Sequence, residues 1–298
     1  MQSDLALKLL RDQNFDCLAV GVLDFKSKKF KALEISEKNI ISPSPFLYFD
    51  LASLTKPLTL FAVKCHDPKL WQKDFDLLLN HRAGLPDWGR LTAKLWREDI
   101  SGYALKKSPT HYSDIGALRL MLELERKTGK SLKELSSFYW DENLIFWKDL
   151  KKEYKTPMTG TRKGLPIKGQ VHDDNAFVID EFCAHAGLFA RIDGLCKSLI
   201  NLNDKTSFVK EMKTLLKKHE GERFCEGWDT AGENSLAGAG HSPFTFGHLG
   251  FTGTSIWIDS EKEIGHVILT NATKKFWYQR EGLNKLRREL GEALWKWI

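Results

Sequence analysis

Strand-like segments lie near both ends of the chain, and mainly helical patterns lie between them. Residues 17–24 and 30–35 are β-rich runs on either side of a lysine-rich turn, and residues 255–259 and 265–271 form a second pair near the C-terminus. No regular alternation of strands and helices links the two pairs. A doubly wound parallel sheet is therefore disfavoured, and we predict a fold of the α+β class.

The helical pattern is clearest in residues 113–128, where apolar residues recur at helical spacing and Gly129 can end the helix. The closing segment, 283–297, has the pattern of a second amphipathic helix, and we expect Arg287 on its polar face. Residues 156–176 are rich in glycine, proline, threonine and charge. We expect them to form a long excursion rather than an element of the core.

Composition is ordinary for a globular protein. The 298 residues are 42% hydrophobic, and the net charge of +6 comes from 45 basic and 39 acidic residues spread along the chain. The aromatic residues are not interleaved with the basic ones, so a nucleic-acid partner is disfavoured. The five cysteines include no Cys-x-x-Cys pair and are expected to be reduced, buried thiols.

The N-terminus lacks the cationic stretch and the long apolar core of a signal peptide. No apolar run approaches the length that crosses a membrane, so we expect no membrane span. As written, the chain is expected to be cytoplasmic. A periplasmic location would follow only if a signal had been removed.

Ser53 and Lys56 form a Ser-x-x-Lys unit within residues 49–64, an apolar segment that we expect to be helical. Residues three apart lie on one face of a helix, so the amine can take the proton of the hydroxyl. Pro57 is tolerated only near a helix start, which places the start at about Ser53. The lysine can act as a base only if burial or a neighbouring cation lowers its pKa. An exposed helix start is the competing interpretation.

Three further segments accompany this unit in order along the chain. Residues 77–86 read Leu-Leu-Leu-Asn-His-Arg-Ala-Gly-Leu-Pro, residues 112–114 read Tyr-Ser-Asp, and residues 247–255 contain His-Leu-Gly before a strand. These three segments resemble, in the same order, the leucine-rich loop, the Tyr-x-Asn element and the His-Thr-Gly element of class C serine β-lactamases. Residues 49–57 resemble the nucleophile segment of that family. DD-peptidases and esterases share that fold. Two more segments resemble the esterase and peptidase-like members, 169–176 and 184–189.

The resemblance implies a β-lactamase/transpeptidase-like fold, in which both chain ends build one antiparallel sheet flanked by the terminal helices. A mainly helical lobe is inserted between the ends. We expect a single domain over residues 1–298, with an α/β lobe of about 1–50 and 235–298 and a helical lobe of about 51–234. The cleft between the lobes would hold Ser53.

The resemblance also implies roles for the site residues. Ser53 would attack a carbonyl carbon, Lys56 and Tyr112 would pass its proton to the leaving group, and water would release the acyl-enzyme. Backbone N–H groups of Ser53 and Phe251 would hold the oxyanion. His248 would line the pocket and help to position the substrate or the proton of Tyr112. The expected substrate-binding residues are Asp114, His248, Gly250 and Phe251.

The third element departs from the family pattern. Leu249 stands where the family has threonine, which removes a hydroxyl that could bind a substrate carboxylate. The register has an alternative, because residues 251–253 also end in Thr-Gly; we prefer His248 for its polar side chain. A literal Lys-Thr-Gly at 127–129 ends the helix after Tyr112 and is interpreted as a helix cap.

The sequence therefore predicts a serine hydrolase that acts through an acyl-enzyme on an ester, amide or lactam of a small-molecule or peptide substrate. An esterase or a D-peptidase of the carboxypeptidase kind is preferred to a β-lactamase, because no distinct base for deacylation is visible. The competing class is a catalytically inactive, penicillin-binding-like binding or regulatory protein. The oligomeric state is not determined.

No cofactor and no metal are expected. Four residues have side chains of the kinds that bind metals, namely His172, Asp173, Asp174 and His185. Their spacing matches none of the usual zinc patterns. The resemblance places them at the rim of the pocket.

Overall fold

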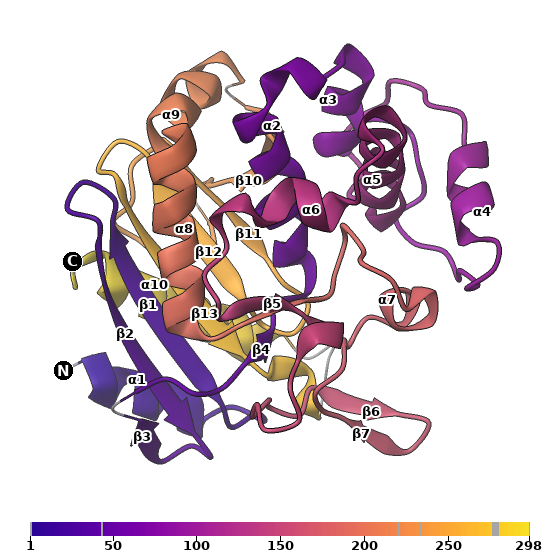
Figure 1. Cartoon of the computed structure of the whole chain (residues 1–298). Helices are drawn as coiled ribbons and strands as arrows, with labels where there is room; N and C mark the ends of the chain where they lie inside the picture. Colours follow the sequence, from indigo (N-terminus) through magenta and orange to yellow (C-terminus); the bar gives the residue numbers. More distant parts are fainter. Residues whose placement is uncertain (1, 43, 220, 233, 276–279, 298) are drawn as a thin grey trace.

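The computed structural model describes residues 2–42, 44–219, 221–232, 234–275 and 280–297. Within these ranges the largest element is an antiparallel sheet, shown in Figure 1. In spatial order its strands are β3 (Ile40–Ser42), β2 (Lys29–Ser36), β1 (Leu18–Asp24), β13 (Ile264–Thr270), β12 (Ser255–Asp259), β11 (Thr245–Leu249), β10 (Trp228–Thr230) and β9 (Phe224–Cys225).

The two ends of the chain meet in the middle of this sheet. β1 pairs with β13 along its whole length, from Leu18 opposite Thr270 to Asp24 opposite Ile264. β1 also pairs with β2 as a hairpin. The predicted α+β class and the sheet built from both ends are therefore confirmed.

Alternation along β1 explains how the sheet is covered on both faces, because successive strand side chains point to opposite sides. Val20 and Val22 pack on one face against α1 (Gln2–Arg11) and α10 (Glu281–Trp295). Ala19 and Leu23 pack on the other face with the apolar residues of α8 (Ile192–Thr206) and α9 (Phe208–Lys218). The result is a three-layer arrangement of helix, sheet and helix (Figure 1).

A helical region is inserted between β3 and β9 and has its own apolar cluster around Leu118 and Met121. In Figure 1 it lies beside the sheet layers. Its α-helices are α2 (Ala62–His66), α3 (Lys73–Leu79), α4 (Trp96–Gly102), α5 (Asp114–Thr128), α6 (Leu132–Ser136) and α7 (Asp174–Ile179). Its short strands are β4 (Phe49–Asp50), β5 (Leu144–Phe146), β6 (Gly160–Arg162), β7 (Leu165–Ile167) and β8 (Leu188–Ala190).

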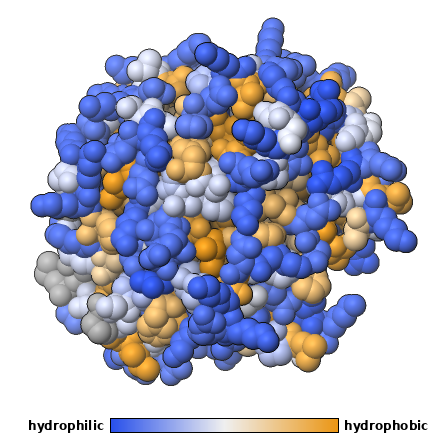
Figure 2. Space-filling model, in the orientation of Figure 1, coloured by the Kyte–Doolittle hydropathy of each residue, from blue (hydrophilic) through white to orange (hydrophobic). Residues whose placement is uncertain are grey.

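The main sheet also takes up β9 and β10, which precede residue 235 in the chain. We propose two lobes in which the last part of the sheet lobe begins near Ile192, because α8 and α9 cover the sheet and β9 and β10 belong to it. Polar residues cover most of the face in Figure 2, and apolar residues form separate patches on it. None of the helices in the described ranges is both long and apolar enough to cross a membrane.

The segment expected to be helical over residues 49–64 begins differently. Phe49–Asp50 forms the strand β4, whose backbone pairs with β8 and is therefore extended rather than helical. The helical path then starts with a 3-10 turn, η1 (Ala52–Leu54), and continues through a π-helical stretch, η2 (Pro57–Phe61), into α2. The start expected at about Ser53 from Pro57 is confirmed.

Two other expectations have clear outcomes. Helix α5 starts after Ser113, whose hydroxyl accepts the N–H of Gly116 at 2.8 Å, and it ends at Gly129 in the left-handed conformation, as expected. The excursion over residues 156–176 contains the β6–β7 hairpin. The described residues also include the short 3-10 helices η3 (Pro68–Leu70), η4 (Ser137–Tyr139), η5 (Trp147–Asp149) and η6 (Ala272–Lys274).

The close contact between β1 and α8 generates a stability prediction. A Cβ at Gly21 would lie 2.5 Å from Sγ of Cys196 and 3.2 Å from Cδ1 of Ile192. We expect Gly21→Ala to lower the free energy of unfolding by about 1–3 kcal/mol, because the helix must shift away from the strand. Urea denaturation measures the change.

The control is Gly89→Ala, whose added Cβ would meet nothing within 4 Å and should change stability by less than about 0.5 kcal/mol. The double variant Gly21→Ala with Cys196→Ala removes the clashing sulfur. It should be more stable than expected from the sum of the two single changes. Equal stability of Gly21→Ala and the wild type would contradict the packing described.

Candidate active site

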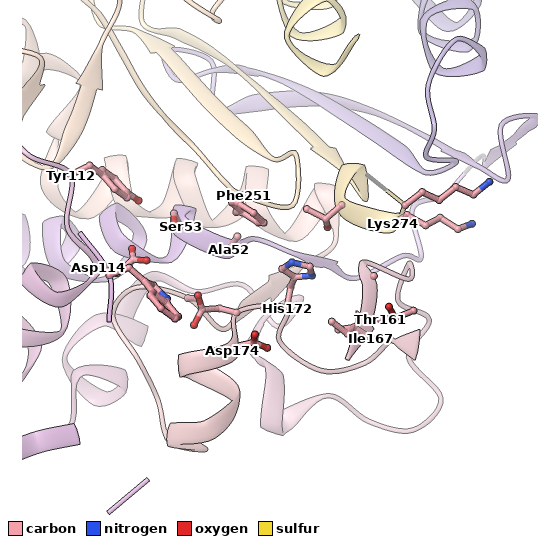
Figure 3. Close-up of a pocket in the computed structure, with 16 residues that line it drawn as sticks. Ala52, Ser53, Tyr112, Asp114, Thr161, Ile167, His172, Asp174, Phe251 and Lys274 are labelled. Atoms are coloured by element: carbon pink, nitrogen blue, oxygen red, sulfur yellow. The ribbon is translucent and has the colours of Figure 1, made fainter. Parts of the chain in front are cut away.

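Ser53 lies in the middle of η1 and opens onto a cavity of about 630 Å³. Figure 3 shows it between Tyr112 and Phe251. The residues that line the cavity include Trp88, Tyr112, Asp114, His172, Asp173 and Phe251, and also Gly160, Thr161, Thr273, Lys274 and Lys275. Figure 3 shows Thr161 and Lys274 at the end of the cavity away from Ser53. Asp114 and Phe251 therefore lie where a substrate would bind, whereas the other two expected substrate-binding residues, His248 and Gly250, are absent from the residues that line this cavity.

The residue before the serine has an unusual backbone. Ala52 adopts a left-handed conformation with φ of 48°, which costs about 1–2 kcal/mol for a residue with a Cβ. The buried carboxyl of Asp50 supports it, since Oδ1 accepts the N–H of Ala52 at 2.8 Å and Oδ2 accepts the N–H of His172 at 2.7 Å. Asp50 thus joins the nucleophile segment to the cavity wall.

Lys56 is buried directly beside the serine. Its Nζ donates to Oγ of Ser53 at 2.9 Å and to the carbonyl oxygen of His185 at 3.2 Å, and it lies 2.6 Å from Oδ1 of Asp114. Burial lowers the pKa of Lys56, but the Asp114 carboxylate and the Tyr112 hydroxyl outweigh burial and raise that pKa overall. The lysine is therefore an ammonium group in the resting site.

Tyr112 reaches the same point from the loop before α5. Its ring lies 4.9 Å from Nζ of Lys56, and burial raises the pKa of its hydroxyl although Lys56 acts in the opposite direction. The ring of His81 packs against it at 4.5 Å and that of His248 at 6.0 Å. His81 also accepts the N–H of Ser113 on Nδ1 at 3.1 Å, which anchors this loop.

His248 sits behind Tyr112. It is 2% exposed, and its Nδ1 lies 2.9 Å from the carbonyl oxygen of Leu249, to which the neutral ring donates. Burial, followed by the charge of Lys56, lowers the pKa of His248 to about 3. His248 is therefore not one of the residues that line the cavity, which corrects the expectation. It packs as a neutral ring against Tyr112.

The turn after β11 is fixed against the nucleophile segment. The hydroxyl of Thr252 donates to the carbonyl oxygen of Asp50 at 2.7 Å, and that of Thr254 donates to the carbonyl oxygen of Leu51 at 3.0 Å. Gly250 must be glycine, because a Cβ there would lie 1.9 Å from Oγ1 of Thr254. These contacts present Phe251 to the cavity, where its ring is 41% exposed.

Arg287 corrects a second expectation. It was expected on the polar face of the closing helix, but it is 2% exposed and points into the protein. Its guanidinium donates to the carbonyl oxygens of Gly250 at 3.3 Å and Thr254 at 2.8 Å. A charged residue on an amphipathic helix is usually solvated, so its residue type led to the polar face, although its spacing from Leu283 and Leu290 places it on the apolar face. Its role is to hold the turn beside the site.

The wall opposite the turn comes from the loop that leads into α7. Asp173 accepts the N–H of Ala176 at 2.8 Å as the helix cap, and its carboxylate lies 2.9 Å from Nε2 of His185. Burial opposes its charge, but His185 and the Ala176 N–H hold the pKa of Asp173 below its usual value. In the described ranges no group of three or more His, Cys, Asp or Glu residues is arranged to hold a metal ion.

Comparisons with known proteins bear on the fold. EstCE1, a hydrolase with promiscuous acyltransferase activity, aligns over 99% of this chain and 98% of its own with a TM-score of 0.67 and 15% identity. A class C β-lactamase from Rhodobacter sphaeroides aligns over 100% and 99% with a TM-score of 0.65 and 13% identity. An octameric penicillin-binding protein homologue from Pyrococcus abyssi aligns over 91% and 72% with a TM-score of 0.63 and 16% identity.

The chain has the β-lactamase fold. This confirms the resemblance as far as architecture is concerned. No family model matches the sequence. Among curated proteins, an N-acetylmuramyl-L-alanine amidase of Bacillus subtilis strain 168 is 29% identical over 196 residues, which are 54% of this chain and 44% of that protein. The match thus spans less than half the length of this relative.

Within the β-lactamase fold the structure brings Ser53, Lys56, Tyr112 and Asp114 together and places Phe251 at the same cavity. Sequence reasoning missed the supporting residues. The hydrogen bonds that give Asp50, His81 and Arg287 their roles link distant segments, and no local pattern predicts them. For Asp50 a partial signal existed, because an aspartate often accepts the N–H two residues later.

The buried Asp50 generates a pH prediction. Burial raises the pKa of Asp50 to about 7, so the folded protein holds this proton more tightly than the unfolded chain does. The resulting stability is complete below the unfolded pKa of about 3.9 and is lost as the pH rises through about 7. Asp50→Asn removes this dependence, because asparagine does not titrate.

The measurement is the free energy of unfolding of both proteins at several pH values. The wild-type value minus the Asp50→Asn value should fall between about pH 4 and 7, at about 1.4 kcal/mol for each unit by which the pKa is raised. A difference that stays constant over this range would show that Asp50 titrates normally.

Proposed function

We propose that this protein is a serine hydrolase that forms an acyl-enzyme on Ser53 and acts on an ester or an amide. The observation that carries the proposal is the 2.9 Å contact between Oγ of Ser53 and Nζ of Lys56 at the wall of a cavity. A hydroxyl paired with a lysine and open to a cavity can be activated for attack on a carbonyl. The fold of the structural neighbours supports the same class of chemistry.

Tyr112 and the backbone complete the proposed machinery. The phenol lies beside Lys56 and can pass a proton between Ser53 and the leaving group. Backbone N–H groups of Ser53 and Phe251 are the proposed donors to the oxyanion, because both residues face the cavity and are linked through Thr252 and Thr254. Each group serves a charge that develops only during the reaction.

The cavity supports a substrate with a bulky acyl or leaving group. Its volume of about 630 Å³ exceeds what a small acyl group fills, and Trp88, Ile167 and Phe251 give it apolar surface. Leu249 offers no hydroxyl for a carboxylate beside the reacting bond. Penicillins and peptide C-termini both present such a carboxylate, so we prefer an esterase, or a D-peptidase that does not depend on this contact, to a β-lactamase.

A second candidate is an amidase that cleaves an N-acylated amino acid. It is favoured by the relative named N-acetylmuramyl-L-alanine amidase, whose match covers 54% of this chain. The competing class, an inactive binding or regulatory protein, is disfavoured because Ser53, Lys56 and Tyr112 are all present and in contact.

Covalent labelling tests the proposed nucleophile. A fluorescent fluorophosphonate should label the wild-type protein, and Ser53→Ala should abolish labelling because the attacking oxygen is gone. Gel fluorescence and intact mass measure the adduct. Ser207→Ala, which alters a serine at the end of α8 outside the cavity, should label like the wild type. Absence of a Ser53-dependent adduct would favour the inactive binding protein.

Turnover tests the substrate preference. We expect p-nitrophenyl octanoate and hexanoate to be cleaved with higher kcat/KM than the acetate, since longer chains contact the apolar walls. Trp88→Ala should reduce this preference by about fivefold, corresponding to about 1 kcal/mol of lost apolar contact. Tyr103→Ala, an exposed aromatic outside the cavity, is the matched control. Nitrocefin, a D-Ala-D-Ala peptide and N-acetylmuramyl-L-alanine compared alongside separate the candidate classes.

A further inference from the structure

The resting site contains a lysine with no lone pair to offer. An ammonium group has three N–H bonds; Nζ of Lys56 donates to Oγ of Ser53 and to the carbonyl oxygen of His185, and it forms an ion pair with Oδ1 of Asp114 at 2.6 Å. Lys56 is 4% exposed, so water does not replace these partners. Before the lysine can accept the proton of Ser53, it must first lose one of its own.

Of these three partners, Asp114 alone can take that proton. The hydroxyl of Ser53 and the peptide carbonyl of His185 are far weaker bases than a carboxylate. The distance of 2.6 Å between Nζ of Lys56 and Oδ1 of Asp114 is that of a short charge-assisted contact, across which a proton can move. No other cation in the described part of the chain lies within ion-pair distance of Asp114.

The other ionisable groups that face Lys56 do not compete for this proton. They are Tyr112, His81, His248 and Asp173. Tyr112 is a neutral phenol. Burial, followed by the charge of Lys56, lowers the pKa of both histidines, so they are neutral but reluctant to accept a proton. Asp173 is already paired with His185 at 2.9 Å.

The position of Asp114 is set by the fold. It is the first residue of α5, and its backbone N–H donates to the carbonyl oxygen of Asp87 at 2.8 Å. The preceding Ser113 caps the helix. In Figure 3 its carboxylate points toward the side of the cavity that holds Tyr112 and Ser53.

We propose that Asp114 is a catalytic residue, the proton acceptor that converts the Lys56 ammonium into the amine that activates Ser53. The inference rests on the proposed acyl-enzyme chemistry and deepens it. It assigns the place of general base to a pair, Asp114 with Lys56, rather than to the lysine alone.

The proton steps balance as follows. The proton moves from Nζ of Lys56 to Asp114, which leaves a neutral amine and a carboxylic acid. The amine takes the proton of Ser53 while Oγ bonds to the substrate carbonyl carbon. The new ammonium then protonates the leaving oxygen or nitrogen through Tyr112 as the bond to the acyl group breaks. In deacylation the amine takes a proton from a water molecule as its oxygen bonds to the acyl carbon; the bond between that carbon and Oγ then breaks, and Lys56 gives the proton to Oγ. Asp114 finally gives its proton back to Lys56.

The test is the pH dependence of acylation in Asp114→Asn. The amide oxygen can still accept a hydrogen bond from Lys56, but it cannot take the proton. The wild-type rate of fluorophosphonate labelling should be flat between about pH 6 and 9, because the pair needs no net loss of a proton. The variant should be about 100-fold slower at pH 7 and should rise tenfold per pH unit, because its lysine must deprotonate into solvent.

Two variants control for structure. Asp114→Glu returns a carboxylate and should recover the flat profile at a reduced rate. Asp193→Asn removes another aspartate from the first turn of a helix, paired with Arg191 at 2.7 Å and outside the cavity, and should behave like the wild type. Thermal unfolding shows whether each variant folds.

An Asp114→Asn variant that is labelled as fast as the wild type, or faster, would overturn the inference. If Lys56 acts alone, removing the Asp114 charge lowers its pKa, and Asp114→Asn should be labelled at pH 7 as fast as the wild type or faster. An unchanged profile in Asp114→Asn likewise assigns Asp114 a structural role only. Failure of the proposed function looks different, because the wild type itself would then acquire no adduct that depends on Ser53.

Discussion

The antiparallel pairing of β1 with β13 is the contact on which the rest of the structure depends. It joins residues as distant in the chain as Leu18 and Thr270 and forms the middle of the sheet. Closing such a long loop costs entropy that grows only slowly with length, and helices on both faces bury the apolar side chains of β1. The serine segment lies in the inserted part, and the turn after β11 lies on the sheet. The site forms where the hydroxyls of Thr252 and Thr254 bind the serine segment.

The electrostatics beside Ser53 are determined mainly by one ion pair, because the neighbouring histidines are neutral. Burial keeps His81 and His248 neutral, which leaves the ammonium of Lys56 facing the carboxylate of Asp114 at 2.6 Å. In a region of low dielectric constant, such a pair dominates the energy of any proton transfer. Arg287, which is also buried, donates hydrogen bonds to the backbone carbonyls of Gly250 and Thr254. It therefore stabilises the turn beside the site and does not contact the cavity.

The fold leaves the choice of substrate to the walls of the cavity. Proteins with the same architecture at 13–16% identity include a β-lactamase and a hydrolase with acyltransferase activity. Here the walls combine the rings of Trp88 and Phe251 with two lysines, Lys274 and Lys275. Lys274 is already paired with Asp16 at 2.6 Å, so its charge is partly compensated. Shape and apolar contact therefore contribute to the proposed selectivity together with the carboxylates that also line the cavity, Asp114, Asp173 and Asp174.

The sequence alone determined the α+β class, the helix start near Ser53 and the pairing of Ser53 with Lys56, and the sheet built from both ends was implied by the resemblance to class C β-lactamases. Strand alternation, proline sterics and the spacing of three residues on a helix are local properties, so one stretch of chain suffices to predict them. Only the tertiary structure decided the charge of Lys56, the place of His248 behind Tyr112 and the burial of Arg287. Each depends on groups that are distant in the chain, and the free energy of a buried charge is set by its neighbours in space.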